Sequence, residues 1–118
     1  MPIVLPPPGP TEAVVSVVAA SLNVADARRL RGAATMGGLM SDTDAPQHGM
    51  LPLPLPYIAG VDGAGIIESV GDADVARRYN IHVGDRVQFH LDPCRSNGAL
   101  AEKTVVNLNS CFRLLDSV

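Results

Sequence analysis

The feature that most constrains the fold is a glycine-rich apolar run from Leu55 to Gly71, followed by the motif Val83-Gly84-Asp85-Arg86-Val87. Glycines at positions 60, 63 and 65 interrupt a stretch that is otherwise typical of a strand. Glycine inside a strand marks a bulge, a bend or a close backbone approach. No suitable strand precedes these glycines and no helix follows them, so they do not match a dinucleotide-binding fingerprint. We therefore predict a bent, closely packed strand over residues 61–70.

The remaining elements are short and are separated by turns. The chain carries 11 glycines and 10 prolines among 118 residues, a composition that favours strands joined by tight turns over long helices. We predict strands at 12–22 (buried on both faces), 86–91 (half-exposed) and 99–106, a short helix at 23–32, a turn at 71–74, and a long loop at 33–56. The predicted fold class is mainly β: a small, partly open β-barrel with one or two short helices.

Composition excludes several classes of function. The net charge is −3 and only 3% of residues are aromatic, which argues against a nucleic-acid partner. No apolar stretch is long enough to predict a membrane span. The two cysteines, Cys94 and Cys111, have no neighbouring ligand residues, so we interpret them as reduced thiols of a cytoplasmic protein.

Six motifs in order resemble a known family, and the similarity covers nearly the whole chain except residues 33–54. The motifs are Ala19 to Asp26, Arg31-Gly32, Gly60 to Gly65, Val83 to Val87, Gly98 to Glu102 and Leu115 to Val118. Together they resemble the N-terminal GroES-like catalytic domain of the medium-chain dehydrogenase/reductase superfamily, in its zinc-independent quinone oxidoreductase-like branch. The resemblance implies a GroES-like, partly open β-barrel.

The resemblance also implies a domain organisation. Residues 1–118 correspond to the substrate-side domain alone, with the nucleotide-binding Rossmann domain absent from this chain. NADPH is then bound mainly by that other domain, and the isolated chain is expected to be inactive. Residues 1–10 resemble the linker after the family's first hairpin, which is itself missing. A barrel without that hairpin exposes a strand edge, so self-association, for example as a homodimer, is expected.

The resemblance bears on metal binding as well. In the zinc-containing relatives a cysteine occupies the position matched by Asn23, and a histidine occupies the position matched by Val61. An amide oxygen is a poor zinc ligand beside thiolate, and valine has no lone pair to offer. We therefore predict no zinc and no other metal. A substrate carbonyl would instead be polarised by hydrogen-bond donors while NADPH supplies hydride.

The candidate catalytic residues are Asn23, Asp26 and Arg28, and the candidate cofactor contacts are Asn23 and Arg28. Asn23 either caps the following helix, contacts the substrate or cofactor, or does both. Asp26 is either a structural acceptor for backbone N–H groups or a proton-transfer group. Arg28 stands near the position where zinc-free relatives carry a tyrosine. Arginine can donate to a substrate oxygen or a phosphate, but it cannot act as a general acid at neutral pH.

Tyr57 and Met50 are the candidate substrate-binding residues. Tyr57 lies where the chain re-enters the barrel, and Met50 belongs to a methionine-containing loop that could form an adaptable apolar lid. Asp62 is interpreted chiefly as a structural carboxylate. The histidines at 48, 82 and 90 are scattered along the sequence, and none is favoured for acid–base chemistry.

Three functions remain open on the sequence. The first is the catalytic-domain part of a zinc-free, NADPH-dependent quinone oxidoreductase-like enzyme, which transfers hydride to a small-molecule quinone, enone or carbonyl. The second is an enoyl-thioester reductase of the same superfamily. The third is a non-catalytic barrel that serves as a binding or assembly module.

Overall fold

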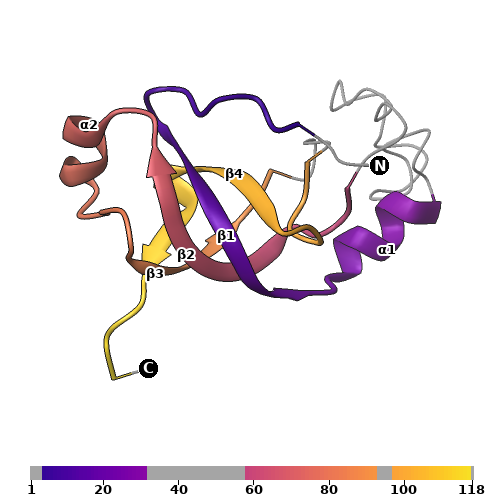
Figure 1. The fold of residues 1–118 in the computed structure, drawn as a ribbon. Helices are drawn as coiled ribbons and strands as arrows, with labels where there is room; N and C mark the ends of the chain where they lie inside the picture. The colour runs from indigo at the N-terminus through magenta and orange to yellow at the C-terminus, as the bar shows by residue number, and fades with distance from the viewer. Residues whose placement is uncertain (1–3, 32–57, 93–96, 118) are drawn as a thin grey trace.

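The computed structural model describes residues 4–31, 58–92 and 97–117, with the side chains of residues 28–31 left outside the description. Figure 1 shows a strongly curved antiparallel sheet with one short helix at each end. The elements in chain order are β1 (Glu12–Ser21), α1 (Val24–Arg31), β2 (Asp62–Val70), α2 (Ala73–Arg78), β3 (Arg86–His90), β4 (Lys103–Asn107), a 3-10 turn (Leu108–Ser110) and β5 (Cys111–Arg113).

The order of the strands explains why the sheet rolls up. The sheet runs β4-β1-β2-β3-β5, so β4 and β5 form its two edges. These edges are consecutive in the chain and are joined by the three residues of the 3-10 turn. Four residue steps can span at most about 14 Å, so the two edges must approach each other although they do not pair. The predicted partly open β-barrel is therefore confirmed.

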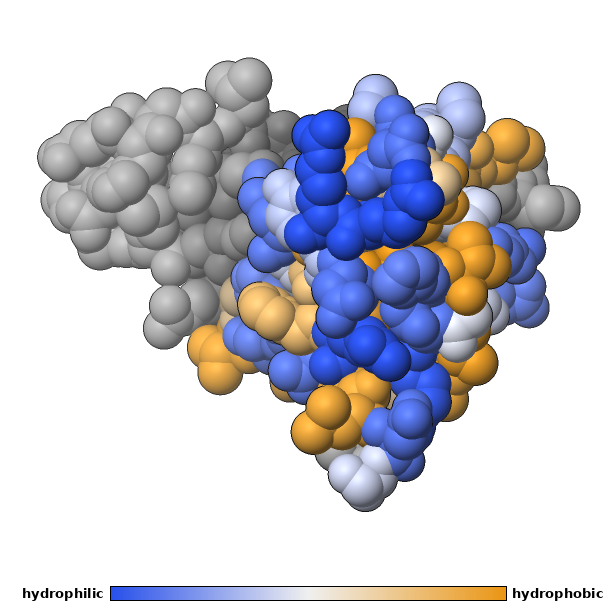
Figure 2. Space-filling view, turned by 90° about the vertical axis from the view of Figure 1, so that its left-hand side faces the viewer, coloured by the Kyte–Doolittle hydropathy of each residue, from blue (hydrophilic) through white to orange (hydrophobic). Residues whose placement is uncertain are grey.

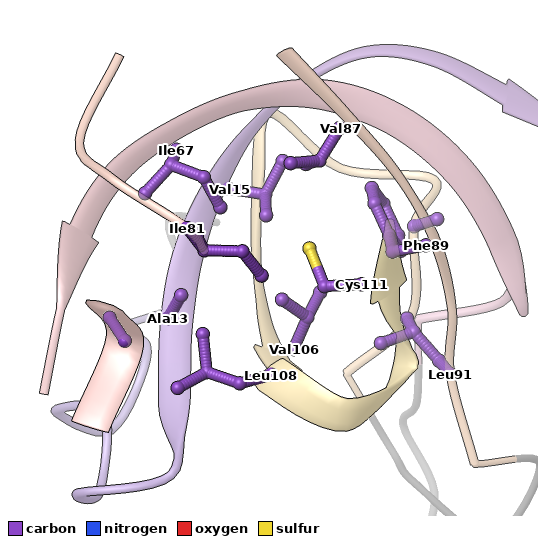
Figure 3. Close-up of a cluster of buried hydrophobic side chains, with 12 residues drawn as sticks. Ala13, Val15, Ile67, Ile81, Val87, Phe89, Leu91, Val106, Leu108 and Cys111 are labelled. Atoms are coloured by element: carbon purple, nitrogen blue, oxygen red, sulfur yellow. The ribbon is translucent and has the colours of Figure 1, made fainter. Parts of the chain in front are cut away.

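The inside of the barrel is filled by small and branched aliphatic side chains. In Figure 3 they point inward from the strands and the turns between them. The Cys111 sulfur lies among these carbons, and burial raises the pKa of its thiol to about 11. The buried cluster comprises Ala13, Val15, Ile67, Ala76, Ile81, Val87, Phe89, Leu91, Ala99, Val106, Leu108 and Cys111.

Two glycines allow β2 to lie against its neighbours. A Cβ added at Gly63 would lie 2.6 Å from the Phe89 ring, and one at Gly65 would collide with the Ser16 carbonyl oxygen of β1. The pairing of β1 with β2 is irregular at two points: between Val14 and Val15 it skips Glu68 of β2, and between Val17 and Ala19 it skips Val18 of β1. These contacts confirm the predicted bent, closely packed strand.

The structure differs from the sequence prediction in four elements. Residues 99–102, predicted as the start of a strand, form a bend, and β4 begins at Lys103. The strand at β1 is confirmed and is paired on both sides, but only Ala13 and Val15 are buried and its last four residues are exposed. Burial on both faces was therefore the wrong expectation, because the far half of the strand extends past the core. Helix α2 begins inside the predicted turn, where the Asp72 carboxylate caps it by accepting from the N–H groups of Asp74 and Val75. β5 lies in a segment for which no strand was predicted.

Figure 2 views the molecule from the end that carries α2, and on this face hydrophilic surface alternates with separate hydrophobic areas. Only Ala76 of this helix is buried, and it belongs to the core cluster. Within the described ranges, neither helix has the length and apolar character that crossing a lipid bilayer requires.

Candidate functional site

The candidate site begins where β1 ends and α1 starts. Asn23 caps α1, because its side-chain Oδ1 accepts a hydrogen bond of 2.9 Å from the Ala25 N–H. In turn, Asp26 Oδ2 accepts a hydrogen bond of 3.0 Å from the Asn23 N–H. This reciprocal arrangement resembles a capping box and fixes the backbone around Asn23. The predicted helix and its predicted cap are therefore confirmed.

Asp26 also ties the start of α1 to a distant part of the chain. Its Oδ1 accepts a bond of 2.9 Å from the Gly60 N–H, 34 residues away. The residue is only 3% exposed, and both of its carboxylate oxygens are used by backbone N–H groups. These are the contacts of a structural acceptor that holds the glycine-rich segment beside Asn23. A proton-transfer role for Asp26 remains a prediction.

Asp62, the first residue of β2, joins two other polar side chains. Its Oδ2 accepts a bond of 2.7 Å from the Asn23 side-chain amide, and its Oδ1 lies 2.7 Å from His90 Nδ1. Strand pairing explains the second contact, since Asp62 and His90 are directly opposite each other in the β2–β3 ladder. The three residues therefore form one hydrogen-bonded chain, with the carboxylate in the middle.

The two hydrogen bonds keep Asp62 ionised. The bonds from His90 and then from Asn23 lower the pKa of Asp62 below its ordinary value of 3.8. An ionised carboxylate only accepts hydrogen bonds, so the hydrogen between the two side chains belongs to His90 Nδ1. Nδ1 is thereby held by the carboxylate and Nε2 is the other ring nitrogen, as in Asp–His pairs that carry out acid–base catalysis.

Asp62 and His90 line a surface groove of about 470 Å³ on the outer face of the sheet. Two rows of cross-strand neighbours form it. The first row is polar and runs Ser21, Asp62, His90, whereas the second runs Ala19, Ala64, Gln88, Phe112. Because neighbouring residues in a strand face opposite sides, Phe89 and Cys111 point into the core while these residues point outward. The groove combines apolar surface with a few polar groups, as small-molecule sites do.

The structure places the predicted site residues only in part. Asn23 and Asp26 lie together as described above, and Arg28 lies in α1 with its side chain outside the described residues. Met50 and Tyr57 also lie outside the described residues. Sequence reasoning missed the contact of His90 with Asp62. The alternation in β3 indicated that His90 faces outward, but nothing in the sequence indicated its register against β2.

The donor atoms around Asn23 do not suit a metal ion. At the position where zinc-containing relatives carry a histidine, Val61 is 1% exposed and has no donor atom. Asn23 already uses its carbonyl oxygen for the helix cap and one amide N–H for Asp62. In the parts of the chain that the structure describes, no group of three or more His, Cys, Asp or Glu side chains could hold a metal ion. These residues therefore do not fit a zinc site of that kind.

The described residues supply only part of what a nicotinamide cofactor needs. All strand pairs of the named sheet are antiparallel, so residues 4–31, 58–92 and 97–117 contain no βαβ unit of the kind that binds a dinucleotide. Asn23 does fit the reactive end of such a cofactor or its substrate. It is exposed, and its amide nitrogen has a second N–H beyond the one given to Asp62.

Fold and site together define a GroES-like domain, an open barrel with a capped helix at its edge. Comparison with known protein families agrees with this class, because residues 9–116 match the alcohol dehydrogenase GroES-like domain. The chain therefore belongs to the alcohol dehydrogenase GroES-like domain family, which confirms the predicted membership of the medium-chain dehydrogenase/reductase superfamily. No curated protein sequence matches the chain.

Several solved structures are similar over the chain. The mycobacterial protein Rv1454c, solved in complex with NADPH, is 26% identical with a TM-score of 0.68 over 100% of this chain and 30% of its own. A quinone oxidoreductase from Pseudomonas syringae pv. Tomato is 32% identical with a TM-score of 0.67 over 100% of this chain and 29% of its own. An alcohol dehydrogenase superfamily protein from Novosphingobium aromaticivorans is 26% identical with a TM-score of 0.65 over 94% of this chain and 28% of its own. The chain thus spans about 30% of the length of the solved structures that it matches.

Proposed function

We propose that this chain is the substrate-side domain of an NADPH-dependent, metal-independent reductase of quinone oxidoreductase type. In this proposal the dinucleotide is bound mainly by a Rossmann domain outside residues 1–118. The substrate is a small-molecule quinone, enone or related carbonyl. The chain contributes the groups that receive and polarise the substrate oxygen.

The observation that carries the proposal is the environment of Asn23. The helix cap and Asp26 fix its backbone, and Asp62 fixes its side-chain amide, so the remaining amide N–H is held in one direction without any metal ligand. A preorganised N–H donor stabilises the negative charge that develops on a carbonyl oxygen during reduction. The ionised carboxylate of Asp62 supports this role, because it accepts one N–H of the Asn23 amide and so fixes the orientation of that amide.

Similarity to other proteins supports the choice of cofactor and substrate. A neighbour with 26% identity was solved with NADPH, and a neighbour with 32% identity is a quinone oxidoreductase. The side chains of Asn23 and Val61 support the zinc-free part of the proposal. They stand where zinc-containing relatives carry a cysteine and a histidine, but the Asn23 carbonyl oxygen is already used by the helix cap and Val61 is a buried alkyl group. A cytoplasmic location and a homodimer remain predictions from the sequence.

The test measures NADPH oxidation by the natural protein that contains this domain, with a naphthoquinone, an enone and an enoyl thioester as substrates in separate assays. We expect turnover with the quinone or the enone, unchanged after treatment with a zinc chelator, and no stoichiometric zinc in the purified protein. Turnover confined to the enoyl thioester would replace the proposal by an enoyl-thioester reductase. Absence of turnover with all three would favour a binding or assembly module.

Asn23→Ala removes the proposed donor but also the cap of α1, so its effect on activity needs a matched comparison. Asp72→Ala removes the cap of α2 in the same way but lies away from the candidate site. Loss of a donor to a developing oxyanion lowers kcat by roughly 100-fold. We expect such a loss for Asn23→Ala and near-normal turnover for Asp72→Ala. Equal rates for the two variants would count against a direct role of Asn23.

A further inference from the structure

Reduction of a carbonyl by hydride leaves one chemical requirement that Asn23 does not meet. NADPH, when bound, supplies hydride, which is one proton and two electrons. In a carbonyl or an enone a new C–H bond forms, whereas a quinone takes up the hydride as the hydrogen of one O–H group; in both cases one substrate oxygen is left with an electron pair. That oxygen needs one proton, and an amide or an arginine cannot give one up at neutral pH. The chain must therefore offer another acid or rely on water.

Resting on the proposed function, we propose that His90 is the proton donor, with Asp62 as its positioning residue, for a substrate whose planar ring lies in the groove on the outer face of the sheet. The Nε2–H bond of the imidazolium breaks, an O–H bond forms on the substrate, and His90 regains its proton from water. The other ring hydrogen stays on His90 Nδ1, which donates it to Asp62 Oδ1 throughout. Atoms and charges balance, since one hydride and one proton together add two hydrogens to the substrate.

The geometry of His90 supports this assignment. Asp62 Oδ1 lies 2.7 Å from Nδ1, which leaves Nε2 as the reactive nitrogen. The side chain is 57% exposed, so both a substrate and the solvent that would reprotonate it can reach the ring. Asp62 is the same carboxylate that orients the Asn23 amide. One ionised group therefore positions both the hydrogen-bond donor and the proton donor.

The groove beside His90 fits a planar ring with oxygen substituents. Ala19 and Ala64 are small, so the second row of residues leaves open surface between β1 and β3. Phe112 is 56% exposed and stands at the β5 side, where it offers a ring face for stacking. Gln88 and His90 supply the polar groups along β3. The cavity volume of about 470 Å³ is within the usual range for small-molecule sites.

The charged groups that flank His90 are carboxylates. The groove contains one charged side chain besides the imidazole, Asp62 on β2. A neighbouring hollow of about 270 Å³ adds Asp92 after β3, together with the uncharged Asn107, Asn109 and Ser110. Both charged groups are acidic, and no lysine or arginine is among the described residues that line these two hollows.

The chain offers a matched control. His82 also pairs with an aspartate three residues along the chain, with its Nδ1 3.5 Å from Asp85 Oδ2, and its side chain is 53% exposed. It does not line the groove. His82→Gln therefore removes an exposed, aspartate-paired histidine and leaves the proposed site intact, whereas His90→Gln keeps a polar side chain but removes the titratable proton.

The first experiment requires no cofactor. The chain is labelled with ¹⁵N at its histidines, and hydroquinone, an analogue of a reduced product, is titrated while the ring nitrogens are followed by NMR. We expect the Nε2 signal of His90 to shift with saturation, its Nδ1 signal to stay that of a protonated nitrogen, and both signals of His82 to stay unchanged. In Asp62→Asn the Nδ1 proton of His90 should lose its fixed position. No shift at His90, or equal shifts at both histidines, would overturn the proposal.

The second experiment measures quinone reduction with NADPH across pH. We expect His90→Gln to lose roughly 100-fold in kcat, in the usual range for removal of a general acid, and to lose the decline in rate that deprotonation of an imidazolium causes as pH rises. His82→Gln should keep both the rate and the pH profile. Unchanged kcat and pH profile in His90→Gln would refute the proton-donor role while the proposed function stands. Absence of turnover in the unmodified protein would refute both, even if hydroquinone still shifts His90.

Discussion

Asp26 is the residue whose removal should most clearly disconnect the candidate site from the barrel. Asp26→Ala leaves two backbone N–H groups without their acceptor, that of Asn23 at the start of α1 and that of Gly60 before β2. The two segments are far apart in the chain and meet at this carboxylate. We therefore expect the variant to lose both stability and the fixed position of Asn23.

The structure sets the size of the loss. A hydrogen bond to a charged group contributes about 1.5–3 kcal/mol, and a buried N–H without a partner costs about 1–3 kcal/mol. The bond to Gly60 is buried, whereas the bond to Asn23 is only partly buried, so water can replace the second acceptor more readily than the first. We expect Asp26→Ala to lower the free energy of unfolding by about 2–4 kcal/mol, out of the roughly 5–15 kcal/mol of a typical domain.

Urea denaturation followed by far-ultraviolet circular dichroism measures this loss, and the midpoint should fall by roughly 1–2 M. Asp26→Asn should lose nearly as much, because its amide would place an N–H against one of the two backbone N–H groups. Asp74→Ala is the control, since Asp74 is an exposed partner of Arg77 and should change stability by less than about 0.5 kcal/mol. If Asp26→Ala unfolds at the same midpoint as Asp74→Ala, the carboxylate does not hold these segments together.

Three further predictions concern the strands, the second helix and pH. Gly65→Ala should prevent normal pairing of β1 with β2, because the added Cβ would collide with the Ser16 carbonyl oxygen. In Gly84→Ala the added Cβ meets no atom within 4 Å, so the free energy of unfolding should fall by only about 1–2 kcal/mol because of the positive φ. Urea midpoints of the two variants measure this difference. Asp72→Ala should lower stability by about 1 kcal/mol through the lost cap, measurable as a lower thermal midpoint. The lowered pKa of Asp62 means that its ionised form stabilises the fold above pH 3.8, and that this contribution disappears as pH falls through the folded-state pKa. The stability difference between the unmodified chain and Asp62→Asn should therefore shrink below about pH 4, and an equal difference at neutral and acid pH would contradict the reasoning.

Local patterns in the sequence predicted much of the fold. The alternation of apolar and polar residues in 86–91 correctly indicated a half-exposed strand, and the glycines at 63 and 65 correctly indicated close packing. The same reasoning missed α2, because a helix of six residues gives too short a pattern to separate from a turn. It missed β5 because a three-residue edge strand is specified by its partner and not by its own periodicity.

The sequence by itself indicated the family, a short helix with Asn23 as a candidate cap, and the outward-facing side of β3, since these depend on neighbours within a few positions. Only the tertiary structure decided which of the outward residues meet. Asn23 and Asp62 are 39 residues apart, and Asp62 and His90 are 28 residues apart, so their contacts arise from the pairing of β2 with β3 and from the placement of α1 by Asp26. A shift of one residue in that pairing would turn His90 toward the core, and a periodicity of two cannot fix the register between strands that are distant in the chain.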